Sequence, residues 1–167
     1  GRDPYDLLDE IEKKLNIKVR PLSWPIGMGK NFRGVYSLYY KSLILFTPSR
    51  TQIDRDDFIE ISIQSPELGR HIGELNANQL REDVEMVEAI YPPFDINEYR
   101  EGKLAPVFFG SAVNNFGVQE LLDCFIDLAP GPLARSNGIR MVLPEEDKFS
   151  GFVFKIHANM DPNHRDR

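Results

Sequence analysis

The chain contains one cysteine in 167 residues and has no long hydrophobic run. A single cysteine, Cys124, excludes an internal disulfide framework and is typical of a protein that folds in a reducing compartment. We expect it to be a packing residue within a helix. No apolar stretch approaches the ~18 residues that a membrane span needs, and no charged-then-apolar signal segment opens the chain. These absences predict a cytoplasmic location and no contact with a membrane.

The motifs of common catalytic and metal sites are also missing. Residues 27–30, Gly-Met-Gly-Lys, lack the glycine that a phosphate-binding loop carries six positions before its lysine, where this chain has Trp24. That loop also needs Ser or Thr after the lysine, where the chain has Asn31, so a β-turn explains these residues better. His157 and His164 are seven residues apart with no cysteine nearby, which is not zinc spacing. We therefore predict no catalytic residue and no metal site in this chain.

Basic side chains are fewer than acidic ones: the chain has 20 Lys and Arg and 26 Asp and Glu residues, which give a formal net charge of −6. An acidic chain argues against non-specific nucleic-acid binding as its main task, since that binding needs phosphate neutralisation. Residues 1–53 nevertheless carry 9 basic and 5 acidic side chains, whereas residues 54–101 carry 4 basic and 13 acidic ones. A local basic surface in the first third is compatible with this distribution, and the acidic middle is typical of a solvated face.

Residues 104–117 are the stretch from which a function can be argued. Residues 106–109 form a short apolar run typical of a buried strand, and we expect the strand to span residues 104–109. Residues 110–112, Gly-Ser-Ala, allow a sharp backbone turn. A helix is expected over Val118–Leu128, with its apolar face formed by Val118, Leu121, Leu122 and Phe125. Strand, turn and helix in this order build a ligand site in open α/β sheets, but a plain structural crossover explains the same spacing.

The rest of the chain predicts further helices and short strands. A helix over Pro4–Leu15 is indicated by Asp3 as its N-cap and by proline at its first position. Residues 32–46 favour a β-hairpin or a pair of short strands, and residues 58–63 favour a short strand. Additional helices are expected over residues 80–91 and 95–101, and a short or edge strand within residues 17–26.

The last forty residues predict a boundary and an incomplete second domain. Residues 129–138 hold two prolines and two glycines, which is a linker composition. Alternating apolar and polar residues then predict a strand over residues 149–158. A single strand cannot bury its own face, so we expect the chain to be a piece of a longer protein. We also expect the edge of this strand to pair with another chain or to be poorly ordered.

Several short motifs resemble one protein family. They lie at residues 2–4, 24–27, 32–36, 108–112, 146–149 and 152–162, and they continue in the terminal residues 165–167. This set is similar to the bacterial peptide chain release factor 3 family, which belongs to the translational GTPases and is related to elongation factor G. The similarity runs through essentially the whole chain. The terminal run is specific, because elongation factor G shares the Val-Phe-Lys-Ile run at residues 153–156 but not the residues after it.

The resemblance implies an α/β fold in several parts. Residues 1–130 would be the C-terminal part of a P-loop GTPase domain, with an inserted α+β subdomain at about residues 21–102. Residues 131–148 would be a linker. Residues 149–167 would begin a second, β-barrel domain, of which this chain holds only the first strand.

The resemblance also implies a function for the intact protein. Members of the family are ribosome-dependent GTPases of translation termination, and they promote the release and recycling of class-one peptide release factors. Their phosphate loop, magnesium-binding threonine, Asp-x-x-Gly switch and Asn-Lys-x-Asp motif all precede the position of Gly1. The intact protein would therefore use GTP or GDP with Mg²⁺, whereas this fragment is expected to be inactive and to bind no cofactor by itself.

One nucleotide motif of the family lies within the chain. Ser111 and Ala112 match the Ser-Ala loop that recognises the guanine base in GTPases. By resemblance, the backbone N–H of Ala112 would donate to the base carbonyl, and Ser111 would brace the loop. Many GTPases have a lysine next, which stacks on the base, but this chain has Val113 at that position.

A second hypothesis stays open beside the GTPase fragment. The chain could be a stand-alone, non-catalytic module whose inserted subdomain and basic first third bind protein or RNA without any nucleotide. Translating the gene upstream of the codon for Gly1 separates the two hypotheses. A phosphate-loop motif and an Asn-Lys-x-Asp motif there would favour the GTPase, and a start codon would favour the module.

Overall fold

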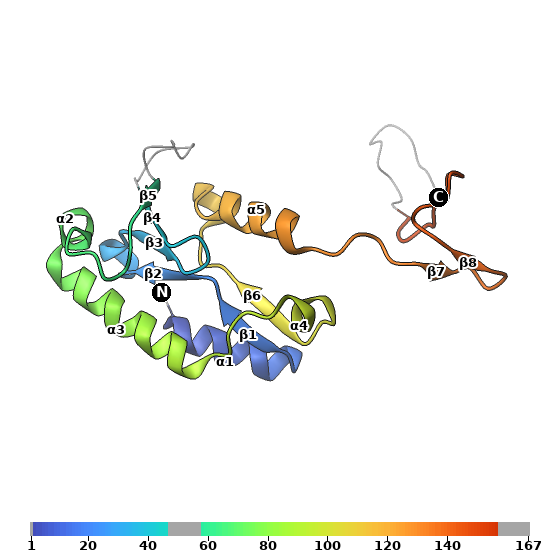
Figure 1. Ribbon diagram of the computed structural model, residues 1–167. Coiled ribbons are helices and arrows are strands. Elements are labelled where there is room, and N and C mark those ends of the chain that lie inside the picture. The colour runs from blue at the N-terminus through green and yellow to red at the C-terminus, as the bar shows by residue number, and fades with distance from the viewer. Residues whose placement is uncertain (1, 47–57, 157–167) are drawn as a thin grey trace, which may run out of the picture. The chain divides into compact units, whose positions relative to one another are not determined.

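The computed structural model describes residues 2–46 and 58–156 of a mixed α/β chain. The chain divides into two compact units, Gly1–Ala129 and Pro130–Arg167 (Figure 1). The first unit contains, in order, α1 (Pro4–Leu15), β1 (Lys18–Pro21), β2 (Ser23–Ile26), β3 (Gly34–Ser37), β4 (Ser42–Leu45), β5 (Phe58–Glu60), α2 (Leu68–Ile72), α3 (Glu74–Ile90), α4 (Ile96–Arg100), β6 (Leu104–Val107) and α5 (Val118–Leu128). The second unit contains β7 (Arg135–Ser136) and β8 (Met141–Val142).

Helix α1 begins and ends where its sequence predicts. The side chain of Asp3 accepts hydrogen bonds from the backbone N–H groups of Tyr5 and Asp6, which the first turn of a helix leaves without partners. At the other end Asn16 adopts the left-handed conformation, and its N–H donates to the carbonyl of Glu12. Leu8 is the residue of α1 that is fully buried.

Strands β1 and β6 pair in parallel and connect distant parts of the chain. Lys18 lies opposite Leu104, and Pro21 lies opposite Val107. The strand predicted over residues 104–109 is therefore confirmed for Leu104–Val107. Residues 17–26 form two short strands, β1 and β2, rather than one, because the chain leaves the parallel pair at Leu22 and enters a second sheet.

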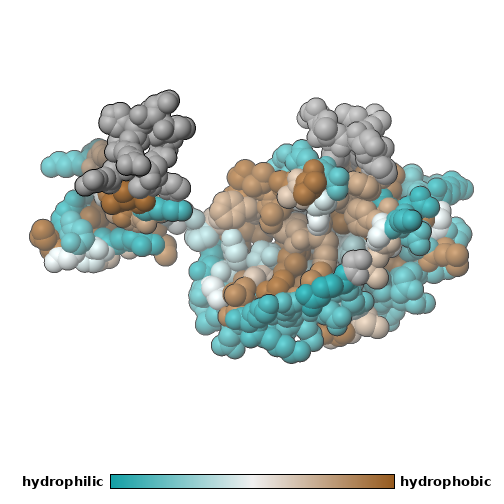
Figure 2. All heavy atoms as spheres, turned by 180° about the vertical axis from the view of Figure 1, so that it is seen from behind, coloured by the Kyte–Doolittle hydropathy of each residue, from teal (hydrophilic) through white to brown (hydrophobic). Residues whose placement is uncertain are grey.

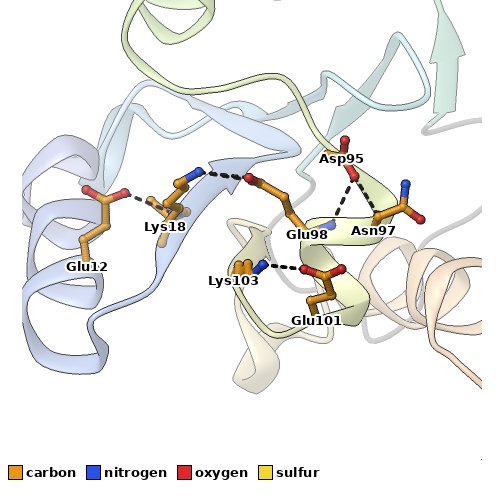
Figure 3. Close-up of polar contacts among 8 residues, drawn as sticks. Glu12, Lys18, Asp95, Asn97, Glu98, Glu101 and Lys103 are labelled. Carbon is orange, nitrogen blue, oxygen red and sulfur yellow. Dashed lines mark hydrogen bonds and ion pairs between the residues drawn. The ribbon is translucent and has the colours of Figure 1, made fainter.

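Polar contacts stabilise this parallel pair at the end where both strands begin (Figure 3). Glu12 of α1 accepts a hydrogen bond from the backbone N–H of Val19 at 3.0 Å, and Lys18 pairs with Glu98 of α4 at 3.0 Å. Helix α4 confirms the helix predicted over residues 95–101, and the side chain of Asp95 caps it by accepting hydrogen bonds from the N–H groups of Asn97 and Glu98. Gly102 then adopts a positive φ of 72° and turns the chain into β6.

The second sheet is antiparallel, with the order β2-β3-β4-β5. The hairpin predicted within residues 32–46 is confirmed as β3 and β4, and β5 confirms the first half of the strand predicted over residues 58–63. The turn expected at residues 27–30 ends in one 3-10 turn, Gly29–Asn31, closed by a hydrogen bond from the N–H of Asn31 to the carbonyl of Met28. Helix α3 packs beside β2 and confirms the helix predicted over residues 80–91 (Figure 1).

Trp24 lies at the centre of the largest hydrophobic core. Its ring centroid is 4.8 Å from that of Tyr5 and 5.5 Å from that of Phe109, and only 1% of the residue is exposed. Its indole N–H donates to the carboxylate of Asp83 at 3.1 Å, which satisfies the polar end of a buried side chain. One side chain thus joins α1, β2, α3 and the loop that follows β6.

The predicted strand over residues 149–158 is wrong for its described part, residues 149–156. These residues form no strand, and Phe149, Phe152 and Phe154 are more than 70% exposed. The physical reason is that a strand needs a neighbour for its backbone hydrogen bonds, and no described strand pairs with this segment. The sheet edge proposed for pairing with another chain is therefore not formed over residues 149–156, and residues 157 and 158 lie outside the described residues.

We predict that Gly34→Ala lowers the free energy of unfolding by about 3 kcal/mol, because it adds both strain and a clash. Gly34 has φ +150°, and a Cβ there would lie 2.0 Å from the carbonyl oxygen of Ile44 on the neighbouring strand. The matched control is Gly102→Ala, where φ is +72° but no atom lies within 4 Å of the added Cβ. This control should cost only about 1 kcal/mol in urea unfolding. Equal losses for both variants would show that the contact between β3 and β4 is looser than described.

Candidate functional site

The predicted site residues lie in a tight loop between β6 and α5, residues 108–117. Ser111 and Phe116 form an isolated antiparallel bridge, in which each N–H donates to the other's carbonyl at 2.8 and 3.0 Å. A single 3-10 turn, Ala112–Asn114, lies between them, and Asn115 closes it in the left-handed conformation. The loop is thus held by its own backbone hydrogen bonds at the carboxyl end of β6.

Two glycines allow this loop to close. A Cβ on Gly110 would lie 2.6 Å from the carbonyl oxygen of Phe116, and a Cβ on Gly117 would lie 2.9 Å from that of Phe109. Gly117 also has a positive φ of 73°, which a side chain would disfavour. The two ends of the loop therefore touch backbone to backbone.

The structure places the three predicted base-binding residues at the start of the 3-10 turn. Ser111 is partly buried, and its hydroxyl accepts a hydrogen bond from the side-chain amide of Asn114 at 2.8 Å. Ala112 is exposed, and within residues 2–46 and 58–156 its backbone N–H finds no acceptor. Val113 is 98% exposed and contacts no core. Ser111 thus engages the loop itself, while the N–H of the exposed Ala112 has no acceptor among the described residues.

A buried aromatic ring anchors the loop to the antiparallel sheet. Phe116 is 2% exposed, and its ring centroid lies 5.6 Å from that of Phe32 and 5.2 Å from that of Phe46, edge to face in both pairs. Val35 of β3 and Ile44 of β4 complete this small core. The β3–β4 hairpin therefore forms the wall against which the loop packs.

A second anchor comes from β2. The backbone N–H of Phe109 donates to the hydroxyl of Ser23 at 2.8 Å, and Ser23 is 2% exposed. Sequence reasoning did not identify Ser23, because nothing in the local pattern shows that a serine on β2 will lie beside a loop 86 residues later.

Helix α5 buries a face other than its apolar side. Its boundaries, Val118–Leu128, are as predicted, and Cys124 is a buried packing residue as expected. The buried side is formed by Glu120, Cys124 and Leu128, and of these Cys124 and Leu128 pack near Leu22 and Phe108. The apolar side is exposed by 44–58% at Leu121, Leu122 and Phe125. The left-handed Gly117 sets the direction of the helix and hence the face that it buries.

The exposed apolar side of α5 is a continuous surface. Ile126, 75% exposed, extends the row of Leu121, Leu122 and Phe125. Seen from behind in Figure 2, apolar side chains gather on the surface of the larger unit at the end that carries α5. Helices of globular domains normally bury such a stripe, so this face is suited to a further packing partner.

Glu120 is an unusual residue that the sequence did not single out. It is 5% exposed, and neither carboxylate oxygen has a hydrogen-bond partner among the described residues. Burial raises the pKa of this carboxyl above its ordinary value, because desolvation disfavours the charged form, and nearby Asp123 adds to the effect. Its position in the first turn of a helix would have suggested only a favourable helix-dipole interaction.

Metal and thiol chemistry find no support in the described geometry. No three His, Cys, Asp or Glu side chains within residues 2–46 and 58–156 lie close enough together to hold a metal ion. His157 and His164 lie outside the described residues. Burial raises the pKa of the Cys124 thiol, which disfavours the reactive thiolate. None of the helices in the described part of the chain has the length and apolar character that a bilayer crossing requires.

We predict that Glu120→Gln raises the free energy of unfolding by about 1 kcal/mol near neutral pH. The folded chain holds the Glu120 proton at higher pH than the unfolded chain does, because its pKa rises from an ordinary value of 4.5. The free-energy cost of burying the charged carboxylate is therefore absent below pH 4.5. This cost grows as the pH rises from 4.5 to the pKa that the carboxyl has in the folded chain. The pH dependence of urea unfolding above pH 4.5 should be flatter in this variant than in the unchanged chain. The control is Glu85→Gln at an exposed position of α3, and a gain of the same size there would contradict the assignment.

Comparison with known proteins gives little further information. No model of a known protein family matches the sequence. Among solved structures, the chain is similar to the crystal structure of a Thermus thermophilus protein, with 19% identity and a TM-score of 0.46. The match covers 79% of this chain and 21% of the Thermus chain, so this chain spans about one fifth of that protein's length.

Proposed function

We propose that the chain is the C-terminal part of the GTPase domain of a translation factor of the release factor 3 family. The intact protein would be a cytoplasmic, ribosome-dependent GTPase that promotes the release and recycling of class-one release factors. The observation that carries the proposal is the Ser-Ala loop at the carboxyl end of a parallel strand, with an Ala112 N–H that has no acceptor among the described residues.

The position of the loop supports a ligand site. Parallel α/β sheets bind ligands outside the carboxyl ends of their strands, where loops lead into helices. Strand β6 pairs in parallel with β1 and is followed directly by residues 108–117 and α5. The short bridged loop is preorganised, so binding would cost little ordering of its backbone.

The chemistry of the loop suits a purine carbonyl. An N–H donor with no acceptor among the described residues is complementary to an oxygen such as the O6 of guanine, and it would repel the amino group that adenine carries in that place. Ser111 would hold this donor in position through its two bridge hydrogen bonds and its contact with Asn114. Val113 points to solvent and would add at most an apolar edge.

The exposed apolar face of α5 supports the idea of a larger domain. Sheets with parallel strands are normally covered on both faces, whereas β1 and β6 are a pair without further neighbours in the described part of the chain. Additional strands beside β6 would also cover Leu121, Phe125 and Ile126, which are otherwise exposed. We propose that the phosphate-binding half of the GTPase domain supplies them.

Catalysis would then reside outside this chain. Phosphoryl transfer needs a phosphate cradle, a metal ion and a positioned water, and the sequence motifs that provide them are not present here. This part of the protein would select the base and orient the nucleotide. Guanine nucleotide, the ribosome and class-one release factors are the partners proposed for the intact protein.

We predict that the isolated chain shows no measurable binding of GDP or GTP in calorimetry at millimolar nucleotide, and no hydrolysis. One or two hydrogen bonds contribute roughly 0.5–1.5 kcal/mol each, whereas micromolar affinity needs about 8 kcal/mol. The protein encoded by the complete gene should bind both nucleotides. Micromolar binding by the isolated chain would contradict the proposal that most of the binding energy comes from outside this chain. If the complete protein bound no guanine nucleotide, the proposed function itself would be contradicted.

In the complete protein, Ala112→Phe should lower the affinity for GDP and GTP by about tenfold or more, because a bulky side chain beside the donor displaces the base. GTP hydrolysis at saturating nucleotide should persist, since the variant leaves the catalytic groups in place. The matched control is Ala89→Phe, which makes the same change at an exposed position of α3. Equal affinity for the two variants would exclude this loop from base recognition.

A further inference from the structure

We infer that the antiparallel sheet β2-β3-β4-β5 sets the geometry of the base-recognition loop, with Ser23 and Phe116 as positioning residues. This inference rests on the proposed function, because the geometry of the loop affects nucleotide binding only if the loop binds the base. Neither residue is proposed to touch the nucleotide. Both act on the loop through described contacts, one at each of its ends.

The first contact fixes the entry of the loop. Ser23 lies on β2 and presents its buried hydroxyl to the backbone N–H of Phe109, the residue before Gly110. This N–H lies beyond the end of β6, so no ladder hydrogen bond serves it there. Removing the hydroxyl would leave a partly buried donor unpaired and free the entry of the loop to shift.

The second contact fixes the exit. The ring of Phe116 packs in one cluster with Phe109 of the loop and with four residues that belong to the β3–β4 hairpin or flank it: Phe32, Val35, Ile44 and Phe46. Side chains in such a core have few alternative arrangements, because close packing leaves no room for the ring to move. The position of the hairpin therefore determines the position of Phe116.

The hydrogen-bonded bridge between Ser111 and Phe116 connects both contacts to the N–H of Ala112. The two hydrogen bonds between Phe116 and Ser111 tie the exit of the loop to the residue just before Ala112. The backbones of Gly110 and Gly117 are in contact, so the entry and the exit of the loop cannot shift independently of one another. A shift of either anchor must therefore move the Ala112 N–H, and sub-ångström displacement is enough to weaken a directional hydrogen bond.

The sheet offers a close control for Ser23. Ser37 lies directly opposite Ser23 in the β2–β3 register and is 1% exposed. Its hydroxyl also accepts a backbone hydrogen bond, from the N–H of Tyr40 at 3.0 Å, but that group belongs to the hairpin turn. Ser23→Ala and Ser37→Ala thus remove the same chemical group from neighbouring positions, and only the first removes a contact with the loop.

The first test measures amide hydrogen exchange by NMR on this chain. In Ser23→Ala, the N–H groups of Ser111 and Phe116 should exchange about tenfold faster than in the unchanged chain, and in Ser37→Ala they should not change. Phe116→Leu, which keeps an apolar side chain, should also speed the exchange of Ser111. Ser23→Thr, which keeps the hydroxyl, should restore slow exchange. Equal exchange in Ser23→Ala and Ser37→Ala would overturn the inference.

The second test measures GDP and ADP affinity in the protein encoded by the complete gene. Ser23→Ala and Phe116→Leu should each weaken GDP binding about fivefold to tenfold and lower the preference for GDP over ADP. A purely structural role would lower stability without changing this preference. If the unchanged protein binds GDP but both variants match Ser37→Ala, the inference fails and the proposed function stands. If the unchanged protein binds no guanine nucleotide, the proposed function and the nucleotide role of the sheet fail together.

Discussion

The burial of Phe116 against the β3–β4 hairpin is the contact on which the candidate site depends. Between the two ends of the loop, residues 110–115 are small or exposed and have no side chain that could hold them in place. The ring of Phe116 therefore supplies packing that these residues lack, and its hydrogen bonds to Ser111 hold the residue just before Ala112. Without this contact the loop would be an ordinary surface turn, with its donor held in no fixed position.

Features with local causes could be predicted from the sequence. Helix α1 follows from Asp3 and Pro4, because an N-cap oxygen and a proline at the first position act within a few residues of one another. The capping of α4 by Asp95 and its end at Gly102 have the same kind of local cause. The β3–β4 hairpin was predictable because its aromatic and branched residues lie close together in the chain.

Features that depend on distant partners could not be predicted. The exposure of the apolar side of α5 could not be predicted, because helical spacing identifies an apolar stripe but not the surface that is available to cover it. The strand over residues 149–156 was wrong because alternation shows what a strand would bury and not whether a neighbour exists. Ser23 and Glu120 gain their importance from burial and from groups far away in sequence, which a single sequence does not contain.

The most direct test of the central claim is a crystal structure of the complete protein with GDP bound. The account predicts that the backbone nitrogen of Ala112 lies about 3 Å from the O6 of guanine, with Phe116 still enclosed by the β3–β4 hairpin. A guanine base bound at another surface, with the Ala112 N–H facing solvent, would contradict it.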